Sequence, residues 1–162
     1  MAKYFTLIIV AFMVFGCVKP PDYPVEPVIE FLSLDKDFMS QGLEDNDLVL
    51  ATISFTDGDG DLGSEDDSIS IVITDLRDNS INTSATRLPM VPPQGAGNGI
   101  SGEITFRLFQ TCCIPPPEFQ RGPCAPNPDY PVDTLLYEVY IVDRAGHESN
   151  KITLDPIYLQ CN

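Results

Sequence analysis

The densest group of side chains able to do chemistry lies in residues 57–67, where aspartates alternate with glycines. The stretch reads Asp57-Gly58-Asp59-Gly60-Asp61-Leu62-Gly63, and further acidic residues follow it directly. Crowded carboxylates repel one another unless a cation lies among them, and glycine lets the backbone curl so that alternate side chains converge. Such hard oxygen ligands suit Ca²⁺, which takes six to eight oxygens at about 2.3–2.6 Å. The alternative is a solvated acidic turn, because Asp-Gly pairs are also ordinary turn formers.

A second acidic turn, residues 143–150, follows an alternating stretch near the end of the chain. In a seven-strand sandwich, the loop after the second strand and the loop before the last strand lie at the same end. We therefore expect four aspartates to bind Ca²⁺, with two further candidates behind them: Asp57, Asp59, Asp61 and Asp143, then Glu65 or Asn150. For Asp143 the alternative is a turn aspartate that accepts hydrogen bonds from its own turn.

The alternating aspartates resemble the start of an EF-hand loop, but the rest of that motif is missing. Leu62 stands where an EF-hand has its glycine, and Ser68 stands where it has the closing glutamate. An EF-hand is therefore rejected. The expected affinity for Ca²⁺ is that of extracellular modules, with Kd of about 10⁻⁴ to 10⁻³ M.

The composition argues against two other classes of function. With 24 acidic and 9 basic residues, the chain repels nucleic acid, so nucleic acid is not an expected partner. No catalytic motif surrounds His147, the single histidine, which is expected to be an ordinary turn residue. Carboxylates in a solvated cluster stay ionised rather than tuned for acid–base work, so we expect no enzyme.

The N-terminus predicts export and lipidation. Lys3 gives a short positive start and residues 4–15 are almost wholly apolar, too short a run to span a bilayer but typical of a signal peptide. The run ends in Val14-Phe15-Gly16-Cys17, which resembles the lipobox of bacterial lipoproteins. That resemblance implies cleavage after residue 16 and acylation of Cys17, which would anchor the protein in a membrane. The alternative is an ordinary secreted protein. Residues 17–27 carry four prolines and are expected to form an extended tether.

Four cysteines remain after Cys17, and export favours disulfides between them over a zinc site. A bridge between the neighbours Cys112 and Cys113 would be strained, so each should find a different partner. One is expected to pair with Cys124 and the other with Cys161; the sequence leaves open which takes which. We therefore predict two disulfides.

The remaining chain, residues 28–162, has the pattern of one all-β domain. About seven stretches alternate apolar and polar residues, clearest at 48–55 and 135–142, and turn-forming residues separate them. Fifteen prolines oppose long helices. The pattern favours a single antiparallel sandwich, with an open barrel as the alternative.

Two segments resemble known families. Residues 137–150 look like the penultimate strand and last turn of bacterial immunoglobulin-like and fibronectin-like modules, and residues 55–63 look like a segment of outer-membrane lipoproteins of the Bacteroidota. The resemblance implies an outer-membrane lipoprotein with an immunoglobulin-like domain, facing the periplasm or the cell surface. The expected function is a non-catalytic, calcium-stabilised accessory or interaction module with an outer-membrane protein partner. The alternative is a lipoprotein that captures glycan or peptide for an outer-membrane importer.

Overall fold

The computed structural model describes residues 22–42, 47–66, 70–77, 83–92 and 99–161. The expected signal peptide and Cys17 lie outside these residues. The described part is built of strands with one short 3₁₀ turn, and no helix in it is long and apolar enough to cross a membrane. The expected all-β class is confirmed.

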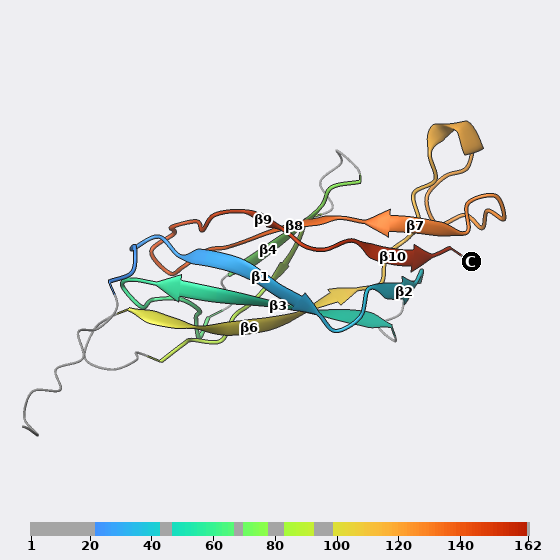
Figure 1. The fold of residues 1–162 in the computed structure, drawn as a ribbon. Helices are drawn as coiled ribbons and strands as arrows, with labels where there is room; N and C mark the ends of the chain where they lie inside the picture. Colours follow the sequence, from blue (N-terminus) through green and yellow to red (C-terminus); the bar gives the residue numbers. More distant parts are fainter. Residues whose placement is uncertain (1–21, 43–46, 67–69, 78–82, 93–98, 162) are drawn as a thin grey trace, which may run out of the picture.

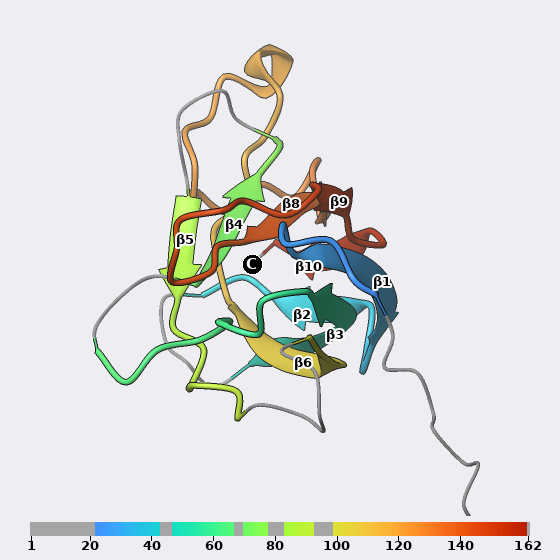
Figure 2. The ribbon, with the colours of Figure 1, turned by 90° about the vertical axis from the view of Figure 1, so that its left-hand side faces the viewer.

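Ten strands are present in the described residues: β1 (Val28–Leu34), β2 (Phe38–Ser40), β3 (Leu48–Asp57), β4 (Ile71–Asp75), β5 (Thr83–Thr86), β6 (Ile100–Phe109), β7 (Val132–Leu135), β8 (Tyr137–Ile141), β9 (Ile152–Thr153) and β10 (Ile157–Gln160). They form three small sheets with the strand orders β1-β3-β6, β2-β10-β7 and β5-β4-β8-β9. Figure 2 looks along the long axis and shows the β5-β4-β8-β9 layer facing the β1-β3-β6 layer across the core.

The core follows directly from the alternation in the sequence. Along β3 every second residue is buried, beginning with Val49 and including Ile53 and Phe55. The partner strand β6 alternates in the same way, so Ile104 lies opposite Ile53 and both face inward. Burial of such side chains contributes about 1.5–3 kcal/mol each, which makes this layer the main source of stability.

The ten strands exceed the seven expected, because two predicted strands are each divided between two sheets and β2 forms in a segment that was not predicted to be a strand. The stretch 135–142 is interrupted at Leu136: β7 before it pairs with β10, and β8 after it pairs with β4. The last strand is likewise divided into β9 and β10 around Pro156, which has no N–H to donate to a ladder. One pairing, β2 with β10, is parallel, whereas the sequence predicted antiparallel pairing throughout.

The two ends of the long axis carry the acidic loop and a cysteine-containing segment. β3 ends at the acidic loop, and at the opposite end lies the proline-rich segment 110–131 (Figure 1). Disulfides Cys112–Cys124 and Cys113–Cys161 fasten that segment. The prediction that the two neighbouring cysteines take different partners is confirmed, and the fold settles the pairing.

A buried ionic network of Arg77, Asp75 and Asp133 contacts the segment 110–131. The Arg77 guanidinium lies 2.6 Å from Asp75 Oδ2 and 2.5 Å from Asp133 Oδ2, and it donates to the carbonyl of Cys112 at 3.2 Å. Asp133 also accepts from the Tyr130 hydroxyl at 2.7 Å. Each of these carboxylates therefore has a cation beside it.

Candidate metal centre

β3 places the first candidate ligand, Asp57, inside the protein. The alternation that turns Ile53 and Phe55 toward the core continues for one more step, so Asp57 also points inward and is fully buried. A buried carboxylate is costly unless a cation or hydrogen bonds compensate its charge. The period-2 pattern of β3 therefore explains why Asp57 is buried.

The loop after Asp57 curls around its carboxylate. Asp57 Oδ2 accepts hydrogen bonds from the backbone N–H groups of Asp61, at 3.0 Å, and Leu62, at 3.1 Å. Gly60 has a φ of 71°, a left-handed conformation that glycine adopts without strain and that allows the tight return. Leu62 is completely buried and anchors the far side of the loop in the core.

The turn after β8 supplies the fourth carboxylate. Asp143 is buried and accepts two hydrogen bonds from one residue, the His147 backbone N–H and ring Nδ1, both at 2.8 Å. Gly146, at a φ of 93°, allows the turn to close. The two acidic turns are further linked by Arg144, whose guanidinium donates to the Gly63 carbonyl at 2.9 Å.

The structure brings the four predicted ligands together. One carboxylate oxygen from each of Asp57, Asp59, Asp61 and Asp143 lies within 4.8 Å of the other three. Two buried oxygens of these residues have no hydrogen-bond partner among the described residues: Asp57 Oδ1 and Asp61 Oδ1. Buried polar atoms are nearly always satisfied, so two orphaned oxygens in one cluster point to a missing positive group.

Electrostatics at the cluster agree with that interpretation. Burial, together with a hydrogen bond and repulsion from Asp59, raises the pKa of Asp57 to about 6. The pKa of Asp61 is also raised, by burial first and then by the charges of Asp143 and Asp59. The charge of Arg144 opposes the shift at Asp61 without cancelling it. A divalent ion among the carboxylates would reverse both shifts.

The donor set fits a hard cation. Four carboxylates give oxygen ligands only, which suits Ca²⁺, and backbone carbonyls or water can complete a coordination number of six to eight. A second group, Asp59, Asp143 and His147, is also close enough to share an ion and would add one nitrogen ligand.

Two lower-ranked candidates lie elsewhere. Glu65 is exposed and is not part of the cluster. The Asn150 side chain instead joins the amide of Ile29, accepting from its N–H at 2.8 Å and donating to its carbonyl at 2.9 Å. Asn150 thereby extends the hydrogen bonding of β1 and is not a ligand of the cluster.

His147 is the residue at this site that the sequence interpretation missed. It was expected to be an ordinary turn residue, but its ring contacts Asp143, which raises the pKa of the imidazole. The Asp-x-x-x-His spacing across a turn containing glycine was the available signal, because such a turn returns the histidine to the aspartate.

The chain matches no family model, no curated protein and no solved structure. The acidic cluster and its surroundings therefore carry the functional argument.

Proposed function

We propose that this protein is a non-catalytic, calcium-stabilised β-sandwich that is anchored by lipid at the outer membrane and serves as an accessory or interaction module. The observation that carries the calcium proposal is the buried Asp57 carboxylate, which lies close to three other carboxylates and whose Oδ1 has no hydrogen-bond partner among the described residues. The ion is structural in this proposal, because it fastens the loop after β3 to the turn after β8.

Calorimetric titration with Ca²⁺ tests the site. With Kd of 10⁻⁴ to 10⁻³ M, 10 mM Ca²⁺ should add roughly 1–3 kcal/mol to the free energy of unfolding. Asp57→Asn should abolish both the heat and the stabilisation, because it removes a buried anionic ligand. Asp129→Asn, in an exposed turn at the other end, is the matched control and should leave both unchanged. A wild-type protein that shows neither heat nor stabilisation contradicts the proposal.

The anchor rests on the sequence, namely the apolar leader and Cys17. Mass spectrometry of the N-terminal peptide from native membranes should find a diacylglyceryl and an acyl group on residue 17. Cys17→Ser should release the protein from the membrane fraction. An unmodified cysteine in the wild-type protein would favour the ordinary secreted form.

An exposed apolar strip supports the interaction role. On the β2-β10-β7 sheet, Phe38 lies directly opposite Tyr158, and their exposed fractions are 44% and 46%. Val132, on the same face of β7, is 45% exposed. Apolar surface of this kind commonly marks a protein partner. Co-purification of the detergent-extracted protein with an outer-membrane protein, lost on Tyr158→Ser, is the expected result, and recovery of the protein alone argues against the role.

One observation favours the alternative of ligand capture. A groove of about 380 Å³ runs between β6 and residues 88–92, within the range of sites for small ligands. Its apolar lining includes Phe55, Met90 and Val91. Glycan and peptide panels would decide, since binding that is lost on Met90→Asp supports capture.

A further inference from the structure

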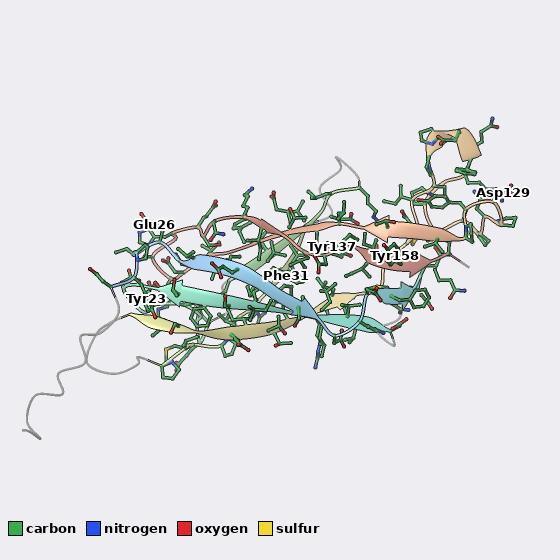
Figure 3. The ribbon with its side chains drawn as sticks, viewed as in Figure 1. Tyr23, Glu26, Phe31, Asp129, Tyr137 and Tyr158 are labelled. Carbon is green, nitrogen blue, oxygen red and sulfur yellow. A yellow bond between two sulfur atoms is a disulfide. The ribbon has the colours of Figure 1, made fainter. Side chains whose placement is uncertain are left out.

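The N-terminal residues that lead into β1 lie against the acidic loop. The Gly58 N–H, between two candidate ligands, donates to the Pro24 carbonyl at 2.7 Å. Figure 3 places Tyr23 and Glu26 at the end of the sandwich where β3 terminates. Residues 22–26, called the docked segment below, therefore rest on the same loop that supplies Asp57, Asp59 and Asp61.

The fit at this contact is close enough to require glycine. A Cβ atom on Gly58 would lie only 2.4 Å from both the Tyr23 and the Pro24 carbonyl oxygens. The Tyr23 ring packs in the same way on Gly99, where a Cβ would come within 3.1 Å of it. Two glycines thus let the docked segment lie directly on backbone, and a change in the path of the loop would separate them.

The docked segment is held more firmly at its C-terminal end than at its N-terminal end. At its C-terminal end the chain is fixed, because Pro27 is buried and the Asn150 amide holds both backbone groups of Ile29. Before that point, the hydrogen bond to Gly58 and the Tyr23 ring are the contacts that hold it. The segment can consequently detach without unravelling β1.

We propose that cation binding and docking of residues 22–26 are coupled: the ion fixes the loop on which the segment rests, and the docked segment raises the affinity for the ion. This regulation rests on the proposed calcium site. Coupling is reciprocal, so each event strengthens the other by the same factor. Because the segment leads toward Cys17, release of residues 22–26 would free about 15 Å of chain in an extended conformation.

Hydrogen exchange on the full chain in detergent, with Ca²⁺ or with EDTA, tests the coupling from the segment's side. We expect Ca²⁺ to slow exchange at the Gly58 amide, which donates to the Pro24 carbonyl of the docked segment, by at least tenfold. Peptides from residues 118–131, at the other end of the sandwich, serve as the internal control and should not change.

Two variants test the coupling from the metal's side. Tyr23 is not itself a candidate ligand, and Tyr23→Ala should weaken Ca²⁺ binding about fivefold, the low end of typical coupling. Gly58→Ala displaces the segment directly and should weaken it more, whereas Gly122→Ala, with open space around it, should not. Ca²⁺ binding that is unchanged by Tyr23→Ala, together with exchange at the Gly58 amide that Ca²⁺ does not slow, overturns the coupling alone. A wild-type protein that binds no Ca²⁺ overturns the calcium site as well.

Discussion

The two ends of the sandwich bury the same residue type with opposite electrostatic results. At one end, burial raises the pKa of Asp133, but hydrogen bonds from Ile114 and Tyr130 and the charge of Arg77 outweigh it, so the net pKa lies below the ordinary value. At the other end, burial, followed by a hydrogen bond with Asp59 and the negative charges of Asp59 and Asp61, raises the pKa of Asp57 to about 6. The comparison shows that burial does not set the charge state of an aspartate; the neighbouring groups do.

The contrast extends to how each end is held. Two disulfides and the buried Arg77 hold the segment 110–131, so the chain itself supplies these constraints. At the acidic end, two buried carboxylate oxygens have no hydrogen-bond partner among the described residues. We infer that the difference lies in pairing: Arg77 pairs directly with Asp75 and Asp133, whereas Arg144 donates to the Gly63 carbonyl and leaves Asp57 Oδ1 and Asp61 Oδ1 unpaired among the described residues.

The largest expected effects come from removing covalent bonds at the cysteine-rich end. The Cys113–Cys161 bridge closes 48 residues and the Cys112–Cys124 bridge closes 12. On chain-entropy grounds, Cys113→Ser with Cys161→Ser should cost about 4 kcal/mol, and Cys112→Ser with Cys124→Ser about 3 kcal/mol. Urea unfolding of both double variants checks the order. Equal losses would show that the entropic account is inadequate here.

Removing the Arg77 guanidinium should leave unpaired buried carboxylates at this end as well. Arg77→Met leaves Asp75 and Asp133 buried without a positive partner and should cost about 3 kcal/mol, the low end for such a loss, because Tyr130 and Ile114 still donate to Asp133. Arg121→Ala, at an exposed position in the same region, is the control and should change the free energy of unfolding by less than about 0.5 kcal/mol. A loss as small as the control's would contradict the role of the network.

The pH dependence should separate the ends in the absence of Ca²⁺. Because the folded pKa of Asp57, about 6, exceeds its ordinary value of 3.8, the folded state holds a proton that the unfolded state has released. Stability therefore falls as pH rises from about 4 to about 6, since the unfolded state binds fewer protons there. The difference in urea midpoint between wild type and Asp57→Asn, measured in EDTA, isolates this contribution. A difference that does not change with pH would refute it.

The smallest expected effect is at His147, and the single histidine makes it easy to observe. The hydrogen bond to Asp143 raises its pKa above 6.5, so its protonated form stabilises the fold below that pH and the benefit is lost as pH rises through the folded value. Titration of the imidazole C2 proton by NMR should show the raised pKa, and Ca²⁺ should lower it by repulsion and by competing for Asp143. A pKa unaffected by Ca²⁺ would place the ion away from Asp143.

Several features followed from local patterns in the sequence. Alternation with a period of two identified β3, β4, β6 and β8, because inward and outward residues of a strand must differ in polarity. The same period, continued by one step, could have revealed that Asp57 is buried. The division of the last two predicted strands was not visible in the sequence. Leu136 and Pro156 mark the breaks, but their effect depends on which strands pair on either side of them.

The sequence by itself determined the all-β class, the clustering of Asp57, Asp59 and Asp61, and the separate partners of Cys112 and Cys113, since each depends on neighbours along the chain. Only the tertiary structure decided which cysteine meets which, that His147 holds Asp143, and that residues 22–26 rest on Gly58. These contacts join segments far apart in the chain or depend on the exact path of a turn. Their distances are set by strand register and turn conformation, which local composition does not encode.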